Sequence, residues 1–234
     1  MKGERFSLTN KPSHSLLVDD PTLTVAEIFY SIQGESSHAG LPCLFFRLSG
    51  CNLHCSYCDA RYACEEPGSV TPLTELLAEA TRFPEVLIEI TGGEPLLQEG
   101  VYPFMAALLA AGRTVLLETN GSIRIDRVPT GVIRIVDLKC PDSGMGEKIA
   151  WENLDLLTPT DEIKFVVASR RDYEWARETL RTHRLGQRVN TILSPVTSCL
   201  APAKLADWLL EDRLPARLQL QLHTQLWPGI SRGV

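Results

Sequence analysis

Short apolar runs alternate with helix-like patterns along most of this 234-residue chain, and few folds accommodate that order. Runs rich in Val, Ile, Leu and Phe indicate buried strands at 43–48, 86–90, 114–117, 132–138, 163–167 and 189–193, with a final strand at 217–222. Helices are predicted from Thr71–Pro72 onward and over 102–111, 172–184 and 202–210. This alternation predicts an α/β chain of βαβ units around a parallel sheet, and it does not distinguish an open sheet from a barrel.

The organisation of the chain is expected to be simple. Residues 1–22 are rich in Ser, Asn, Lys and Pro and show little periodicity, so we expect a flexible extension there and a single domain over 23–234. The polar start does not resemble a secretory signal, and no apolar stretch reaches the roughly 20 residues that a membrane span needs. We therefore expect a cytoplasmic protein without a membrane partner.

The charge of the chain narrows its partners. Lys and Arg number 23 against 29 Asp and Glu, which gives a net charge of −6. Proteins that bind duplex nucleic acid usually carry a basic face, and no run of Lys or Arg provides one in this sequence. A small-molecule substrate is therefore expected rather than a nucleic acid.

Four motifs follow directly after predicted strands. They are Gly50-Cys51, Thr91–Pro95, Glu118–Gly121 and Lys139–Pro141. The carboxyl ends of parallel strands meet at one edge of an open sheet or one end of a barrel, where binding sites usually lie. The four motifs are thus expected to converge on one site.

The cysteine spacing demands a chemical explanation. Three of the seven cysteines, Cys51, Cys55 and Cys58, form a CxxxCxxC loop, and an odd total argues against a disulfide scaffold. Thiolates this close need a metal to offset their repulsion. A structural zinc prefers four protein ligands, and His54 is poorly placed beside Cys55, whereas a 4Fe-4S cluster held by three cysteines leaves one iron open for a small molecule. A zinc-binding adaptor remains the non-enzymatic alternative.

This loop, with Tyr57 before its last cysteine, and the later segment Thr91-Gly92-Gly93-Glu94-Pro95 together resemble the radical S-adenosylmethionine (SAM) superfamily. The resemblance implies a partial, incomplete TIM-like β/α barrel that uses a 4Fe-4S cluster and SAM. It also implies that the Gly-Gly-Glu backbone meets the amino group of SAM. Glycines suit this role because no side chain blocks the approach of a ligand.

Five further segments resemble the 7-carboxy-7-deazaguanine synthases of that superfamily: 27–35, 46–51, 118–121, 137–141 and 221–234. The resemblance implies a lyase that contracts 6-carboxy-5,6,7,8-tetrahydropterin to 7-carboxy-7-deazaguanine with loss of ammonia, on the route to queuosine and related 7-deazapurines. The enzymatic alternative is a glycyl-radical activating enzyme. That class shares the size and the cysteine loop, but it would not need the motifs at 30–35 and 118–121.

The resemblance also implies roles for individual residues. Because the cofactor carries the radical, no side chain is assigned as catalytic; the expected SAM contacts are Tyr57, Asp59, Gly93, Lys139, Cys140 and Ser194. The expected substrate contacts are Ile32, Gln33, Gly34, Arg47, Thr91, Glu118, His223 and Val234. Chemistry supports three of these, since an arginine suits a carboxylate, a carboxylate suits the N–H groups of a guanidine-like ring edge, and an amide can pair with another amide. Cys43, Cys64 and Cys199 receive no role.

Two positions depart from the family pattern. Ala60 stands where the family often has Thr or Ser, whose hydroxyl helps to hold a magnesium ion, so magnesium dependence is expected to be weakened. Thr224 follows His223 where the family commonly has Lys, so one positive charge is missing near the substrate, which Gln225 or Arg232 could replace. The expected partners are an electron donor such as flavodoxin or ferredoxin and a second copy of the chain in a homodimer.

Overall fold

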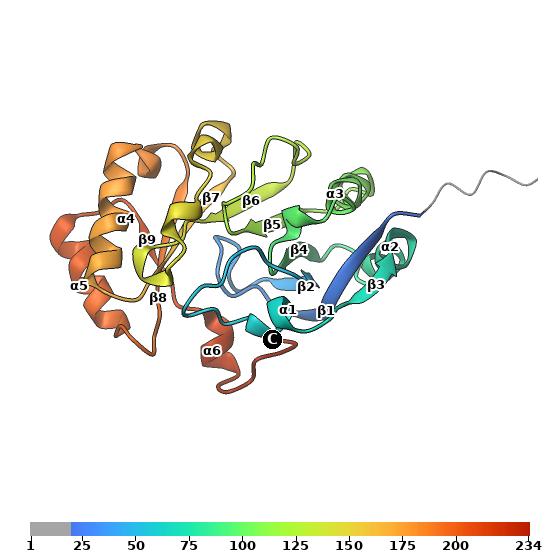
Figure 1. Cartoon of the computed structure of the whole chain (residues 1–234), viewed down its shortest axis with the longest axis horizontal. Coiled ribbons are helices and arrows are strands. Elements are labelled where there is room, and N and C mark those ends of the chain that lie inside the picture. The colour runs from blue at the N-terminus through green and yellow to red at the C-terminus, as the bar shows by residue number, and fades with distance from the viewer. Residues whose placement is uncertain (1–19) are drawn as a thin grey trace, which may run out of the picture.

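The strands form one curved sheet that continues from end to end of the molecule (Figure 1). The structure is a computed structural model and describes residues 20–234. In that part of the chain, nine strands follow the order β3-β1-β2-β4-β5-β6-β7-β8-β9. Their bounds are β1 Thr22–Ile32, β2 Pro42–Leu48, β3 Ser69–Pro72, β4 Leu87–Gly92, β5 Val115–Thr119, β6 Ile133–Asp137, β7 Glu162–Val167, β8 Asn190–Pro195 and β9 Arg217–Leu218.

Six α-helices connect or follow these strands in the described part of the chain: α1 Arg61–Glu65, α2 Leu73–Thr81, α3 Val101–Ala110, α4 Arg170–Thr182, α5 Pro202–Asp212 and α6 Leu222–Leu226. Five 3₁₀ helices lie at Pro95–Leu97, Pro141–Ser143, Gly146–Lys148, Trp151–Leu156 and Leu185–Gln187. The four longer helices α2 to α5 lie along the outside of the sheet, while α6 and the C-terminal end lie near its open side (Figure 1). Within residues 20–234, no helix has both the length and the apolar character to cross a membrane.

The sheet is a partial barrel, as expected. β3 and β9 are its two edges and do not pair with each other in the described structure, so the barrel stays open. From β2 to β9 every neighbouring pair is parallel, which confirms the βαβ prediction for this part of the sheet. β1 is antiparallel to both β2 and β3, which the alternation did not predict. The connection between β1 and β2 is too short for the crossover that parallel strands need.

Most predicted element positions are confirmed to within a few residues, with three corrections. The last strand ends at Leu218 rather than 222, because Gln219 turns to the 33–36 segment and donates its side-chain N–H to the Ser36 carbonyl. Thr71 belongs to β3 and its hydroxyl donates to the Ser69 carbonyl, so it does not cap α2. The extension predicted over 1–22 lies outside the described residues for 1–19, and β1 already begins at Thr22.

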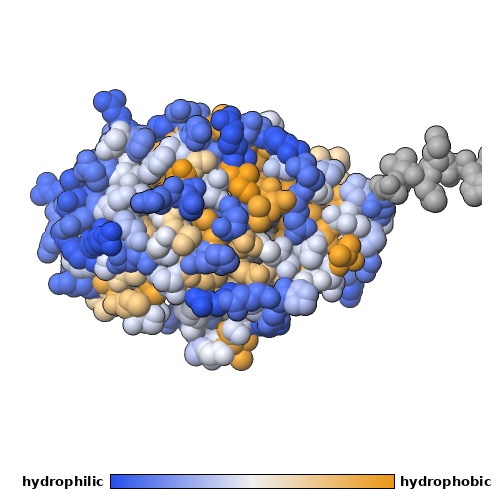
Figure 2. Space-filling model, viewed as in Figure 1, coloured by the Kyte–Doolittle hydropathy of each residue, from blue (hydrophilic) through white to orange (hydrophobic). Residues whose placement is uncertain are grey.

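Each strand has an outer and an inner face, because successive side chains point to opposite sides. The outer face packs against the helices in one large apolar core that includes Phe46, Ile90 and Phe104. The inner face is apolar only near the amino ends of the strands, where Cys43, Phe45, Leu87, Leu116 and Ile135 pack together. Polar residues cover most of the surface in Figure 2, with a group of apolar residues near its centre.

Two residues further along each strand, the inner face becomes polar and charged. These positions are Arg47 on β2, Glu89 on β4, Glu118 on β5, Asp137 on β6 and Lys164 on β7. The strand periodicity thus places an apolar plug below a charged layer at the carboxyl ends of the strands.

Candidate active site

A cavity of about 550 Å³ opens above this charged layer. Its size is within the range typical of small-molecule sites. The four motifs predicted to converge all contribute to its walls. The predicted residues that line it are Ile32, Gln33, Gly34, Arg47, Cys51, Cys55, Tyr57, Cys58, Asp59, Thr91, Gly93, Glu118, Lys139, His223 and Val234.

Two predicted SAM contacts, Cys140 and Ser194, are not among the lining residues. Cys140 is fully buried in the outer, helix-facing core, so only its backbone could approach a ligand. Ser194 is also buried, and its hydroxyl has no hydrogen-bond partner. It lies two residues before Val196, which does line the cavity. The Cys140 thiol therefore points away from the cavity, and Ser194 on β8 lies beneath the cavity wall.

The cysteine loop is held on three sides. It leaves β2 at Gly50, whose φ of 93° only glycine adopts readily, and the Gly50 N–H donates to the Ala63 carbonyl over 2.8 Å. The Tyr57 hydroxyl donates to the Val166 carbonyl on β7 over 3.0 Å. Asn120, at the end of β5, donates to the Cys51 sulfur over 3.6 Å. These contacts fix the loop with its thiols toward the cavity.

The donor set of the loop fits an iron–sulfur cluster. Burial raises the pKa of Cys55 and Cys58, and each of the two thiols is destabilised further as an anion by Cys51, whereas Lys139 favours their ionised forms. Three thiols on one loop beside the cavity can hold three irons of a 4Fe-4S cluster and leave the fourth iron open for a small molecule.

Cys64 lies beside this group, although the spacing of the motif gave it no role. It is on α1 and lines the same cavity. Burial raises the pKa of its thiol to about 12, and the proximity of Cys51 and Cys58 contributes to the rise. The loop therefore has a fourth sulfur close to two of its three expected ligands.

The glycine pair packs directly on the cysteine loop. The N–H of Gly93 donates to the Leu48 carbonyl over 3.0 Å, and the N–H of Glu94 donates to the Gly50 carbonyl over 2.8 Å. A Cβ at position 93 would lie 2.0 Å from the Gly50 oxygen. The buried Glu94 carboxylate accepts from the Thr119 hydroxyl and from the Asn120 N–H over 2.7 Å. Glu94 thus joins the glycine segment to the motif at the end of β5.

Lys164 is the main cavity residue that the sequence analysis missed. Its side chain is only 4% exposed, and its Nζ lies 2.6 Å from Glu35 Oε2, in an ion pair with Glu118 and 3.7 Å from Asp137 Oδ2. Burial would raise the pKa of Glu118, but Lys164 outweighs it and holds that pKa far below its ordinary value. A lysine inside an apolar run was the available signal, because lysines are almost never fully buried unless they are paired.

Glu89 and Gln33 form a second buried pair. The Gln33 amide donates to the Glu89 carboxylate, and its carbonyl accepts from the Glu35 N–H over 2.6 Å. Burial, together with the nearby Glu118, raises the pKa of Glu89 to about 8. The Gln33 side chain therefore shapes the turn after β1, and only one of its amide hydrogens remains for a ligand.

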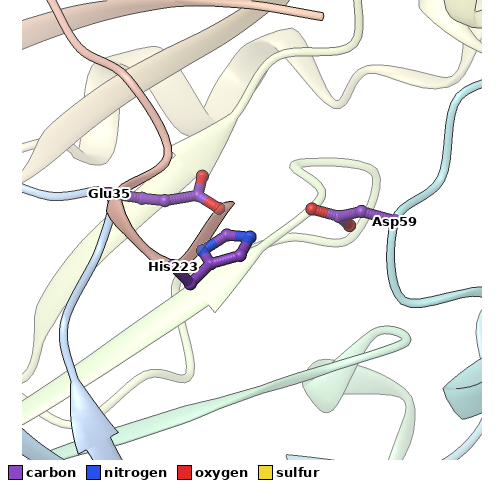
Figure 3. A group of neighbouring side chains, drawn as sticks. All are labelled: Glu35, Asp59 and His223. Atoms are coloured by element: carbon purple, nitrogen blue, oxygen red, sulfur yellow. The ribbon is translucent and has the colours of Figure 1, made fainter. Parts of the chain in front are cut away.

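Glu35, Asp59 and His223 converge at the side of the cavity toward the C-terminus (Figure 3). One ligand atom from each lies within 4.8 Å of the other two. The Gln221 amide donates to Glu35 over 2.9 Å and to Asp59 over 3.0 Å. This group could hold a cation, and it joins the C-terminal segment to the loop that follows the cysteines.

Arg47 is fixed by Glu27 on β1. Its Nε donates to Glu27 Oε1 over 3.0 Å, and the same carboxylate accepts from the Tyr62 hydroxyl and the Gly233 N–H. Arg232 pairs with Glu66 and lies over the Tyr62 ring, and it does not line the cavity. Lys164, unlike Arg232, therefore supplies a positive charge inside the cavity.

Comparison with known proteins decides the family. Residues 47–197 match the Radical SAM superfamily. The 7-carboxy-7-deazaguanine synthase of Koribacter versatilis is 46% identical over 227 residues, which cover 91% of this chain and 100% of that protein. The enzyme of the same name from Chlorobaculum tepidum is also 46% identical, covering 91% of this chain and 97% of its own length. The chain belongs to the 7-carboxy-7-deazaguanine synthase family.

A solved structure of similar fold supports the architecture of this family member. The crystal structure of QueE from Escherichia coli matches with a TM-score of 0.71 and covers 86% of this chain and 94% of that chain. At 24% sequence identity, this likeness concerns the fold alone. As a member of the 7-carboxy-7-deazaguanine synthase family, the chain is a radical SAM enzyme.

Proposed function

We propose that this enzyme contracts the ring of 6-carboxy-5,6,7,8-tetrahydropterin to 7-carboxy-7-deazaguanine, with loss of ammonia, in the synthesis of queuosine or related 7-deazapurines. One observation carries the proposal: a single cavity brings together the cysteine loop, the glycine pair and the polar side chains of β2, β4 and β5. Its family membership supports the proposal over nearly the whole chain.

The cofactor side of the cavity is assigned to the cysteine loop and its neighbours. Cys51, Cys55 and Cys58 would hold the 4Fe-4S cluster, and Tyr57, Asp59, Gly93 and Lys139 would contact SAM, with Ser194 and the Cys140 backbone as further candidates. When bound, the cluster and SAM supply the radical chemistry that removes a hydrogen atom from the substrate. Lys139, whose Nζ is 2.7 Å from Asp137, places a positive charge suited to the SAM carboxylate.

The substrate side is assigned to the opposite wall. Arg47 would bind the pterin carboxylate, and Glu118 would accept from the N–H groups of the pyrimidine edge. Ile32, Gln33, Gly34, Thr91, His223 and Val234 complete this wall. The wall orients a flat heterocycle and excludes water, which is the contribution that a protein makes when its cofactor carries the reactive group.

Substrate-dependent turnover tests the proposal. Anaerobically reconstituted enzyme with SAM and a reductant should release 5′-deoxyadenosine only when carboxytetrahydropterin is added, and it should form 7-carboxy-7-deazaguanine. Reconstitution itself should yield a brown protein that contains iron and sulfide. Release that does not depend on the pterin would favour a glycyl-radical activating enzyme. Tight zinc binding without colour would favour the adaptor.

Replacing Arg47 by alanine should weaken substrate binding much more than SAM binding. A dry carboxylate would lose its charged partner, which costs about 2–4 kcal/mol, or a factor of about 30 to 1,000 in affinity. The fixed Glu27 keeps its contacts to Tyr62 and Gly233, so the C-terminal segment should stay in place. Titrations of pterin and of SAM separate the two effects; a fall in SAM affinity with unchanged pterin affinity would contradict the assignment.

The proposal also includes a magnesium ion, and turnover is expected to depend on it less than in family members with Thr or Ser at position 60. Ala60 lines the cavity without offering a ligand atom, so the ion would depend on water, substrate and the nearby group of Glu35, Asp59 and His223. Ala60→Thr should increase the stimulation of turnover by magnesium, because it adds a hydroxyl. Ala60→Val is the control, because the valine side chain has nearly the shape of threonine but no hydroxyl. If the magnesium titration curves of wild type and the Thr variant coincide, the idea is wrong.

Three further assignments are proposals that rest on the family resemblance. They are an external electron donor of the flavodoxin or ferredoxin class, a homodimeric state and a cytoplasmic location. The reaction requires a one-electron donor to reduce the cluster, and the chain offers no second redox motif in its sequence.

A further inference from the structure

Lys164 occupies a position that the proposed reaction does not explain. It projects from β7 into the charged layer of the cavity and contacts two carboxylates that come from different parts of the chain. Glu35 follows β1 and lies 2.6 Å from Nζ, and Glu118 on β5 forms the second ion pair. A buried lysine has a large desolvation cost, so such a position is stable only with well-placed partners.

The other cations near the cavity cannot replace it. Arg47 pairs with Glu27, and Lys139 pairs with Asp137 over 2.7 Å. In residues 20–234, Lys164 is the only cation that forms ion pairs with both Glu35 and Glu118. Glu89 lies beside the pair on β4 and hydrogen-bonds with Gln33. Without Lys164, three carboxyl groups would share a partly buried site with no cation between them.

The two carboxylates are also oriented by neutral neighbours. Glu118 Oε2 accepts from the Thr91 hydroxyl over 3.2 Å, and Glu35 Oε1 accepts from the Gln221 amide over 2.9 Å. Each carboxylate therefore has one oxygen held by Lys164 and the other by a hydrogen-bond donor of the cavity wall. Carboxylate oxygens accept more than one hydrogen bond, so both groups can still accept from a ligand.

We propose that Lys164 is a positioning residue that determines substrate specificity, because it holds Glu118 as an ionised acceptor for a 2-amino-4-oxopyrimidine ring edge. The inference rests on the proposed function and extends it to a residue outside the predicted substrate contacts. An ionised carboxylate accepts from the 2-amino group and repels an oxygen at that position. A protonated carboxyl group would instead donate to the oxygen and lose the discrimination.

Two ligands that differ at this position, and in the hydrogen that lumazine carries on the adjacent ring nitrogen N1, test the inference. 6-Carboxypterin carries the 2-amino group, and 6-carboxylumazine carries an oxygen there. Neither fully oxidised ring has the hydrogen at C6 that the reaction removes, so binding is measured without turnover. Binding to the reconstituted enzyme with SAM is followed by calorimetry between about pH 6 and about pH 7.5, a range in which wild-type Glu118 stays ionised.

Wild type should prefer 6-carboxypterin, and its affinity at each pH is the reference for the variants. Lys164→Met should bind it at least about tenfold more weakly at the acidic end and recover affinity as the pH rises. The sign follows from burial, which raises a carboxyl pKa once the cation is gone, so the ionised fraction then increases with pH. The other charged or titratable groups that face Glu118 and Lys164 are Glu35, Arg47, Glu89, Asp137 and Lys139, and Asp59 and His223 lie beside Glu35. Lys164→Met should also lose the preference over 6-carboxylumazine.

Arg134→Met is the matched control, since it removes a cation that pairs with the buried Asp161 outside the cavity and leaves both ion pairs of Lys164. It should keep the wild-type pH profile and the preference for the 2-amino ligand. The inference would be overturned if Lys164→Met bound as wild type does, if its binding were weakened equally at every pH, or if it kept the preference for the 2-amino ligand. Wild type that fails to bind 6-carboxypterin would contradict the proposed substrate class instead.

A second variant guards against misfolding. If Lys164→Met does not fold, the double variant with Lys164→Met and Glu118→Gln is measured instead. It removes one positive and one negative charge, and the glutamine side chain stays neutral at every pH. This double variant should bind 6-carboxypterin without the pH dependence and without the preference for the 2-amino group. A preference that persists in it would overturn the inference as well.

Discussion

Replacing Cys55 by alanine should abolish both cluster assembly and turnover. The loop offers three thiols for the four irons of the cluster, so the intact loop leaves one iron without a protein ligand. The loss of one thiol leaves two irons without a protein ligand. Iron and sulfide analysis after anaerobic reconstitution, with the absorbance of the cluster, measures the loss directly. Full cluster content in Cys55→Ala would contradict the assignment of the loop.

Cys55 is a sharper test than its two partners because of Cys64. That thiol lies beside Cys51 and Cys58, so it could replace either one as a ligand in a single variant. Cys51→Ala and Cys58→Ala are therefore best measured in a Cys64→Ala background, where we expect both to lose the cluster. Cys64→Ala alone is the matched control and should retain full iron, since the three motif cysteines remain.

Gly93→Ala should strongly impair SAM binding and lower stability. A Cβ at this position would lie 2.0 Å from the Gly50 oxygen and 2.4 Å from the Gly50 carbonyl carbon, and both of these atoms belong to the backbone. The cysteine loop or the end of β4 must then move, at a cost of about 1–3 kcal/mol or more. Equilibrium SAM binding to the reconstituted enzyme and thermal unfolding of the protein measure the two effects.

Gly146→Ala is the control for Gly93→Ala. Its Cβ would come no closer than 3.2 Å to another atom, the Lys139 carbonyl oxygen, so a small adjustment can accommodate it. We expect nearly wild-type unfolding and SAM affinity from this variant. If Gly93→Ala behaved in the same way, the close packing of the glycine segment on the cysteine loop would not matter for binding.

The parallel part of the sheet was predictable because buried strands have a strong local signal. Each central strand is covered on its outer face and, near its amino end, on its inner face, so its apolar residues form a short run there. β1 and β3 have weaker patterns, and their antiparallel pairing depends on the length of the connections rather than on composition. The short strand β9 ends where Gln219 contacts the 33–36 turn, a contact far apart in sequence.

The residues that line the cavity were largely predictable as well, because sequence motifs sit at the carboxyl ends of consecutive parallel strands. The exceptions involve side-chain direction. Cys140 belongs to such a motif, but its side chain points into the helix-facing core. Lys164 belongs to no motif, but its parity turns it toward Glu35 and Glu118. A shift of one residue along a strand exchanges the two faces.

The sequence by itself determined the α/β class, the cysteine and glycine motifs and the family, because these depend on local spacing and on residue types. Only the tertiary structure decided which charges meet. Glu35, Glu118 and Lys164 are separated by 46 to 129 positions in the sequence. The approach of Cys64 to Cys51 likewise depends on how α1 packs. Partial burial then makes these contacts decisive, since an ion pair is weak in water but controls protonation where its groups are shielded from water.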